Sequence, residues 1–76
     1  MFYVYVLKNG KGRLYVGHTN NLERRITEHN TGLSPYTKNR GPWELAYSES
    51  FDTRGEAMKR EKFLKSGKGR ELLKSI

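Results

Sequence analysis

Residues 2–17 read FYVYVLKNGKGRLYVG, and this stretch decides the fold. Its first six residues are all β-branched, aromatic or aliphatic, which is typical of a strand. Residues 9–12 (NGKG) then supply turn-forming side chains, and residues 14–17 (LYVG) resume the strand pattern. The stretch therefore predicts a β-hairpin at the start of the chain.

Both faces of the first predicted strand are apolar or aromatic. Alternate side chains of a strand share a face, so one set is Phe2, Val4 and Val6 and the other is Tyr3, Tyr5 and Leu7. Such a strand is expected in the centre of a sheet, covered on both sides. Tyr5 and Tyr15 lie on the same face only if the turn has an odd number of residues, for example three with one left-handed glycine.

The next segment has the pattern of an amphipathic helix. Asn20 and Glu23 have the spacing of a capping box, and Gly32 ends the pattern. The positions that share the helix face are Leu22, Arg25, Ile26 and His29. Residues 32–42 (GLSPYTKNRGP) contain both prolines, so they predict an irregular basic surface loop.

A third strand and a second helix complete the pattern. Trp43, Leu45 and Tyr47 alternate with Glu44, Ala46 and Ser48, which predicts a strand that runs to about Phe51. Thr53 and Glu56 form a second capping box, before a helix expected to end at Gly67. Its packing stripe comprises Ala57, Glu61 and Leu64. A short terminal helix is expected from about Lys68.

The order of these elements predicts an α+β fold. A local hairpin followed by helix, strand and helix favours a small three-stranded, mainly antiparallel sheet flanked by helices over a parallel doubly wound sheet. The chain has 76 residues, which allows one domain over residues 1–76 and leaves no room for a second lobe or an enclosed cofactor cavity.

Composition excludes several classes of function and favours one kind of partner. There is no cysteine, so disulfides and cysteine-based zinc sites are excluded, and a metal would need oxygen or histidine ligands. No apolar run approaches the roughly 20 residues of a membrane span, so we expect a cytoplasmic protein without a membrane partner. The formal charge of +7 favours a polyanion, but charge alone does not distinguish DNA, RNA and a membrane surface.

Three polar residues occupy positions where a packing face should be apolar. Arg25 and His29 share a face with Leu22 and Ile26; Arg25 either snorkels or binds a ligand, and His29 either caps the helix end or belongs to a site. Glu61 either pairs with Lys65 one turn later, lies solvated among basic neighbours, or holds a hard cation such as Mg²⁺.

The sequence that contains these residues resembles the GIY-YIG nuclease superfamily over essentially the whole chain. The resemblance rests on Tyr3-Val4-Tyr5, Tyr15-Val16-Gly17, residues 21–26 (NLERRI), Glu28-His29-Asn30 and residues 56–62 (EAMKREK). It is closest to small standalone members similar to the catalytic domain of the UvrC repair nuclease and to nucleases that cut branched DNA. Tyr3 stands where the name-giving pattern has glycine, and His18 where the repair enzymes have lysine.

The resemblance implies a catalytic site and a cofactor. By motif position the catalytic residues are Tyr5, Tyr15, Arg25 and Glu61, with His29 as an assisting residue. Glu61 would anchor Mg²⁺ or Mn²⁺, and Arg25 would bind the scissile phosphate. One tyrosine, Tyr5 for preference, would help to deprotonate water, while the other orients the water or phosphate; His18 or His29 would favour ionisation of the phenol.

The resemblance makes structured DNA, such as flaps or branches, the expected substrate, with a metal-dependent endonuclease of DNA repair or processing as the expected function. The candidates for DNA contacts are His18, Arg24, Tyr36, Lys38 and Arg40.

Two other functions stay open for this sequence. One is a nucleic-acid-binding module of the same fold with little or no cleavage activity, and the other is a small basic protein that binds ribosomal RNA or an acidic partner. A protein that targets the domain to DNA is a possible partner, and the sequence does not give the oligomeric state.

Overall fold

A computed structural model describes residues 1–32 and 40–75. In chain order the elements are β1 (Phe2–Asn9), β2 (Leu14–Thr19), α1 (Leu22–Asn30), β3 (Trp43–Phe51), α2 (Arg54–Leu64) and α3 (Gly67–Leu73). This order confirms the predicted α+β fold and its terminal helix. No helix in the described ranges is long and apolar enough to cross a membrane.

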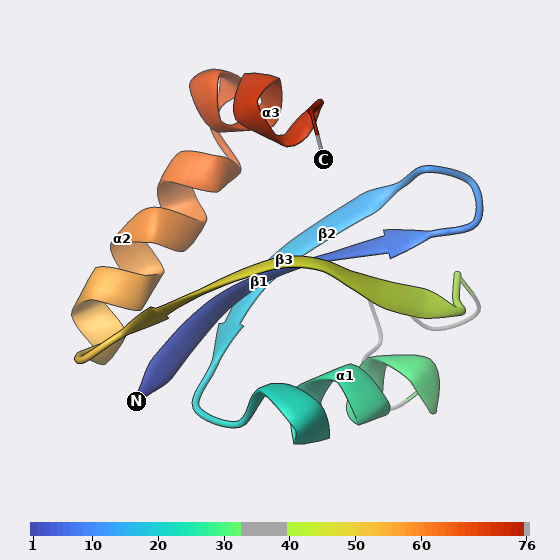
Figure 1. The fold of residues 1–76 in the computed structure, drawn as a ribbon, viewed down its shortest axis with the longest axis horizontal. Helices are drawn as coiled ribbons and strands as arrows, with labels where there is room; N and C mark the ends of the chain where they lie inside the picture. The colour runs from blue at the N-terminus through green and yellow to red at the C-terminus, as the bar shows by residue number, and fades with distance from the viewer. Residues whose placement is uncertain (33–39, 76) are drawn as a thin grey trace.

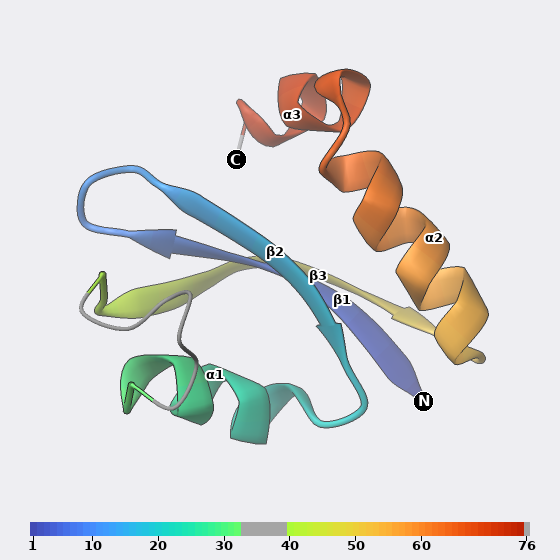
Figure 2. The same ribbon diagram turned by 180° about the vertical axis from the view of Figure 1, so that it is seen from behind.

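The three strands form one antiparallel sheet in the order β2-β1-β3, so β1 is the central strand, as predicted. Helix α1 covers one face of the sheet, while α2 and α3 lie on the other side (Figures 1 and 2). Val4 and Val6 are buried in the cluster with α2 and α3, whereas Tyr5 and Leu7 are buried in the cluster on the α1 side. The two apolar faces of β1 therefore face two separate cores.

Arg13, just before β2, pairs with Asn9, whose N–H donates to the Arg13 carbonyl over 3.0 Å. The turn between these two residues therefore has three residues, Gly10, Lys11 and Gly12, and places Tyr15 on the same face as Tyr5. The N–H of Gly12 donates to the carbonyl of Asn9 over 3.0 Å, and Gly12 has a φ of 80°. A glycine adopts this left-handed conformation without steric penalty. The resulting register pairs Tyr15 with Leu7 and Gly17 with Tyr5.

The predicted third strand is confirmed as β3, which ends at Phe51 as expected, but a bulge interrupts its side-chain alternation. Val6 pairs with Tyr47 and Leu7 with Leu45, which leaves Ala46 as an extra residue in a β-bulge. A bulge shifts the side-chain alternation by one residue, so Trp43 and Tyr47 face opposite sides of the sheet. Trp43 is buried, but Leu45 and Tyr47 are exposed instead of belonging to the core.

Two predicted helix boundaries also need correction. The N-cap of α1 is Asn21 and not Asn20, because its side chain accepts a hydrogen bond from the Arg24 N–H, while its own N–H donates to the Thr19 hydroxyl. Thr53 caps α2 as predicted, through the Glu56 N–H. Gly67 does not end α2; that helix ends at Leu64, and Gly67 is the first residue of α3.

Ser66 explains the early break between α2 and α3. Its side chain accepts from the Gly69 N–H and so caps a new helix one turn after the end of α2. Gly69 also permits close packing of the two helices, because an added Cβ would lie 2.1 Å from the Phe63 carbonyl oxygen. The sharp corner therefore depends on one serine and one glycine.

Candidate active site

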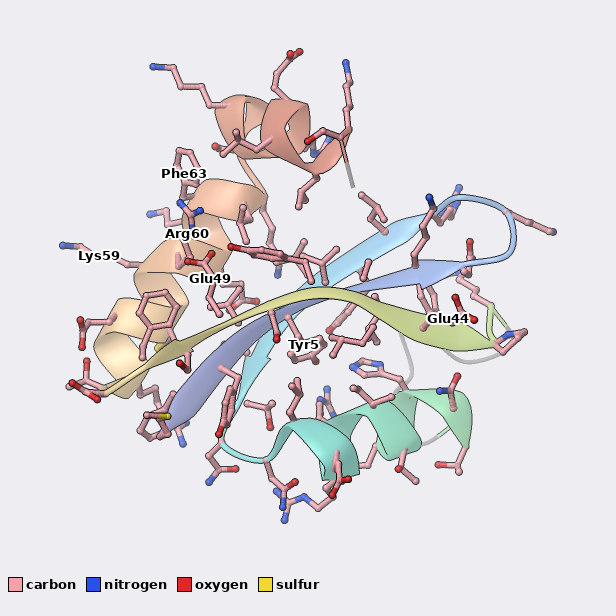
Figure 3. The ribbon with its side chains drawn as sticks, viewed as in Figure 1. Tyr5, Glu44, Glu49, Lys59, Arg60 and Phe63 are labelled. Atoms are coloured by element: carbon pink, nitrogen blue, oxygen red, sulfur yellow. The ribbon has the colours of Figure 1, made fainter. Side chains whose placement is uncertain are left out.

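A hydrogen-bonded cluster lies between the sheet and α1, centred on Tyr5. Tyr5 is 1% exposed, and its hydroxyl lies 2.8 Å from Nε2 of His29. Nε of Arg25 donates to the same hydroxyl over 3.4 Å. Figure 3 shows Tyr5 on the α1 side of the sheet, as the alternation of β1 requires. The central strand and α1 thus bring three of the predicted catalytic residues into direct contact.

His29 is buried, and its surroundings favour the neutral imidazole. Burial lowers the pKa of the His29 imidazole, and the nearby Arg25 charge lowers it further. A neutral ring has one nitrogen that donates and one that accepts, and the tautomer sets which of them faces Tyr5. In the tautomer that leaves Nε2 without a proton, this nitrogen accepts from the Tyr5 hydroxyl, whose oxygen also accepts from Arg25. His29 is consequently a buried hydrogen-bonding group, not an exposed cation at the helix end.

Tyr5 is a protonated phenol in the resting protein. Burial raises its pKa to about 12, although the hydrogen bond from Arg25 opposes this shift. A phenol of this pKa is not ionised at neutral pH. Its proton nevertheless has an acceptor in place, because His29 is already in hydrogen-bond contact.

Tyr15 lies against the same histidine from the neighbouring strand. Its ring centroid is 4.7 Å from that of His29, with the planes inclined at 59°, and 6.3 Å from that of Tyr5. Trp43 contacts the outer side of Tyr15 at a centroid distance of 6.4 Å. The two motif tyrosines therefore flank one imidazole.

Glu28 orients Arg25 on the surface of α1. Nη1 of Arg25 donates to Oε1 of Glu28 over 3.0 Å, and this hydrogen bond raises the pKa of the guanidinium above its usual range. The Arg25 side chain is 33% exposed, so a charged ligand can reach it from solvent. Glu28 had no role among the sequence predictions, although the spacing of three residues on a helix indicates the pair.

Gly17 provides the space that the Tyr5 hydroxyl occupies. An added Cβ at Gly17 would lie 2.6 Å from the Tyr5 oxygen and 3.2 Å from a carbon of the Tyr15 ring. Real Cβ atoms do not approach other atoms so closely. The glycine of the second motif is therefore required by the first tyrosine, which faces it across the strand pair.

Glu61 lies on the other side of β2. Its Oε1 is 2.6 Å from Nδ1 of His18, and its Oε2 accepts from Nζ of Lys65 over 2.8 Å. Burial alone would raise the pKa of the Glu61 carboxyl, but the hydrogen bonds from Lys65 and His18 outweigh it and lower the pKa. The helical pair with Lys65, one of the alternatives that the sequence left open, is thus present.

Adjacent residues of β2 connect the two groups. Gly17 faces the Tyr5 hydroxyl on the α1 side, and its neighbour His18 holds Glu61 on the α2 side. Since β2 is an edge strand, both groups border the same open edge of the sheet. The Glu61 charge also contributes to the raised pKa of Tyr5, which reflects their proximity. A ligand at this edge can meet the half-buried Tyr15 phenol, the Arg25 guanidinium and the Glu61 carboxylate, whereas Tyr5 lies buried beneath them.

Comparison with known proteins identifies the family of this chain. The sequence matches the family model described as the GIY-YIG catalytic domain over residues 1–74. The chain belongs to the GIY-YIG family, which is a family of nucleases. It is 44% identical over 75 residues to the UPF0213 protein of Staphylococcus saprophyticus, a match that covers 97% of this chain and 92% of the relative.

Two further relatives agree with this assignment. The UPF0213 protein of Clostridium perfringens is 50% identical over 66 residues, covering 86% of this chain and 71% of the relative. The solution NMR structure of the UPF0213 protein of Bacillus halodurans superposes with a TM-score of 0.59 at 38% identity, covering 99% of this chain and 84% of the other. The resemblance seen in the sequence and the α+β fold are therefore confirmed.

The predicted DNA contacts lie in several places on this GIY-YIG domain. His18 is bonded to Glu61, and Arg24 lies on the exposed side of α1, 3.8 Å from Glu28. The Arg40 carbonyl accepts from the Asn9 side chain, which places Arg40 beside the hairpin turn. Tyr36 and Lys38 lie outside the described residues.

A second basic surface near the turn was missed by the sequence analysis. Lys11, Arg13 and Arg40 line a pocket of about 540 Å³ together with Asn9 and residues 10, 41 and 42. The signal was present as basic residues around the turn glycines, but nothing in the sequence placed the turn beside residue 40. This surface adds two cations to the predicted set.

Glu61 is the residue that fits the divalent metal of GIY-YIG nucleases. No group of three or more histidine, aspartate or glutamate side chains able to hold a metal occurs within residues 1–32 and 40–75. Mg²⁺ often takes one or two carboxylates and completes its shell with waters and substrate phosphates. The Glu61 side chain is 18% exposed at the open edge, so it fits this mode of binding once Lys65 or His18 releases an oxygen.

Proposed function

We propose that this protein is a divalent-metal-dependent endonuclease that hydrolyses DNA phosphodiester bonds. The observation that carries the proposal is the contact between Tyr5 and His29, with Arg25 on the same phenol oxygen. A phenol placed between a guanidinium and a neutral imidazole can pass its proton to the imidazole. A tyrosine that only packs in the core does not need these two partners. Glu61 at the same strand edge supplies the carboxylate of a hydrolytic site.

In the proposed reaction, water at the edge of β2 attacks the scissile phosphorus. The Tyr5 oxygen accepts a proton from this water as its own proton passes to Nε2 of His29, so that no free phenolate with a pKa of about 12 has to form first. A new phosphorus–oxygen bond forms as the bond to the leaving oxygen breaks, and solvent returns a proton to that oxygen. Tyr15, on the other side of His29, orients the water or the phosphate.

Arg25 binds the scissile phosphate and offsets the charge that develops on it. The guanidinium stays charged and is held in place by Glu28. When Mg²⁺ or Mn²⁺ is bound at Glu61, it supplies Lewis-acid stabilisation of the phosphate and leaving oxygens. Arg24, Arg40 and the neighbouring Lys11 and Arg13 contact the DNA backbone, which gives affinity without sequence specificity.

The substrates that we propose are flapped or branched DNA in repair or processing, with a separate protein as the targeting partner. The scaffold is small, and its cations are placed for phosphates. Recognition of DNA shape therefore suits it better than reading of base edges. A cytoplasmic location remains a prediction from the sequence.

One observation favours a second candidate function, a DNA-binding module of the same fold without cleavage. Both carboxylate oxygens of Glu61 are already bonded, one to His18 and one to Lys65. If these contacts persist on DNA, no oxygen of Glu61 is open to a metal. Binding would then depend on the basic surface alone.

Cleavage assays distinguish the two functions. Labelled duplex, single-stranded, flap and branched DNA are incubated with the protein and Mg²⁺ or Mn²⁺, and the products are resolved on denaturing gels. Glu61→Gln and Arg25→Ala should each lose about 100-fold or more in rate, because each removes a charged group from the transition state. Lys59→Gln, which changes an exposed cation on α2 (Figure 3), should cut like the wild type. Salt-sensitive binding by every variant with no cutting would support the binding module.

A further inference from the structure

A groove lies along the outer side of β2, where this strand faces the corner formed by α2 and α3. It has a volume of about 530 Å³, within the roughly 300–1,000 Å³ of sites that bind small ligands. Its lining residues are Leu14, Tyr15, Val16, Leu64, Lys65, Arg70 and Leu73. Five of its seven lining residues take no part in the site contacts described above; Tyr15 and Lys65 are the two that do.

The residues that line the groove indicate which kind of ligand would fit it. Four aliphatic side chains contribute its apolar surface, and the polar groups are one phenol, one ammonium and one guanidinium. None of its seven lining residues is acidic. An apolar surface bordered by two cations is complementary to an anion that carries a flat, weakly polar group, which describes a nucleotide.

Two lining residues connect the groove to the active site. Lys65 donates to Glu61 over 2.8 Å, and the ring of Tyr15 lies 4.7 Å from that of His29. The groove therefore borders the site, and a strand whose phosphate lay at the edge of β2 would have the groove beside it. The next nucleotide along that strand is the part of the substrate that meets it.

A base inside a duplex cannot enter this groove, because it is paired and stacked between its neighbours. An unpaired base can leave the stack at lower cost and turn into a protein pocket. We propose that the groove binds an unpaired nucleotide beside the scissile phosphate, with the base against Leu14 and Leu73 and its phosphate on Arg70. The inference rests on the proposed nuclease function and deepens it, since it makes unpaired DNA the preferred substrate.

Binding measured without divalent ions tests the groove separately from cleavage. The probes are fluorescent oligonucleotides of equal length, one single-stranded and one in a duplex, and the quantity compared is the ratio of the two dissociation constants. Leu14→Ala and Arg70→Gln should each reduce the preference for the single strand, together by about tenfold. Leu72→Ala and Lys59→Gln change exposed residues that do not line the groove. They should leave the ratio unchanged, and thermal melting of each variant checks the fold.

A second readout locates the nucleotide. Titration with a dinucleotide, followed by amide shifts in NMR spectra, should move Leu14, Val16 and Leu73, whereas inorganic phosphate should move only residues near Lys65 and Arg70. Equal binding of both oligonucleotides by the wild type, a ratio unaffected by Leu14→Ala and Arg70→Gln, or the same shifts with phosphate alone would each overturn the proposal. A single-strand preference that these two variants remove would support the groove even if no DNA were cut, so the groove and the nuclease activity can fail independently.

Discussion

The hydroxyl of Tyr5 lies 2.8 Å from Nε2 of His29, and this hydrogen bond joins the central strand to the last turn of α1. Both side chains are almost fully buried. A buried donor and acceptor in contact stabilise the fold modestly, but an unmatched partner is destabilising. The same bond therefore contributes to stability and, on the proposed mechanism, to proton transfer.

Tyr5→Phe separates these two contributions. We expect the free energy of unfolding to fall by only about 1–2 kcal/mol, because the ring still fills its site while His29 loses its partner. The cleavage rate should fall by about 100-fold or more, since the proton acceptor for water is gone. Urea unfolding and DNA cleavage by the same preparation test both values. A variant that cuts as fast as the wild type would exclude Tyr5 as the route for the proton.

Acid should destabilise the protein through His29. The pKa of His29 in the folded state lies below its usual value of 6.5, so between the two values the unfolded chain binds more protons than the native one. Stability therefore rises with pH across this window and is lost as the pH falls below about 6.5. We expect a steeper loss of unfolding free energy between pH 7 and 5.5 for the wild type than for His29→Gln. Equal slopes would show that His29 does not carry the effect.

Gly17→Ala should damage the site through a single methyl group. The new Cβ would lie 2.6 Å from the Tyr5 oxygen, so the phenol must move away from His29 or the strands must separate. Overpacking of this kind typically costs about 1–3 kcal/mol, and we expect cleavage to fall as in Tyr5→Phe. Gly10→Ala in the same hairpin is the matched control, because nothing lies within 4 Å of its Cβ position. Both variants are compared by thermal melting and cleavage.

Gly69→Ala should weaken the corner between α2 and α3. Its Cβ would meet the Phe63 carbonyl at 2.1 Å and Leu64 Cα at 2.4 Å, and a backbone contact cannot be relieved by rotating a side chain. We expect a loss of stability of about 2–3 kcal/mol or a detached α3. Gly67→Ala, two residues earlier and open within 4 Å, should be tolerated. Unfolding curves for the two variants that coincide would contradict the packing described here.

Most of the architecture followed from local patterns in the sequence. The apolar character of both faces of β1 predicted its central place. Whether Tyr5 and Tyr15 share a face stayed open in the sequence, because it depends on the number of residues in the turn. The bulge at Ala46 was not predictable, because an extra residue in one strand leaves no mark on the alternation of that strand alone. It depends on how two distant segments pair.

The site was predictable residue by residue but not in its contacts. The motif resemblance proposed Tyr5 and His29, yet a bond between residues that are 24 positions apart depends on how α1 packs on the sheet. The cap at Asn21 instead of Asn20 has a similar origin, since two asparagines in succession offer the same side chain, and only the Thr19 hydroxyl distinguishes them. Local sequence patterns indicated the candidate residues, and tertiary packing determined which contacts these residues make.

The three-residue turn between β1 and β2 has a consequence for how this domain can vary. Its odd length keeps Tyr15 on the side of α1 and His18 on the side of α2. Loss or gain of one residue in this turn would reverse the two faces of β2. Tyr15 would then point toward α2 and His18 toward α1, although every side chain remained present. Two residues added as a pair would merely lengthen the ribbon. A hairpin of this kind can therefore gain residues two at a time without moving its side chains to the other face. The number of residues in this turn, which is remote from the chemistry, thus decides whether the site residues can meet.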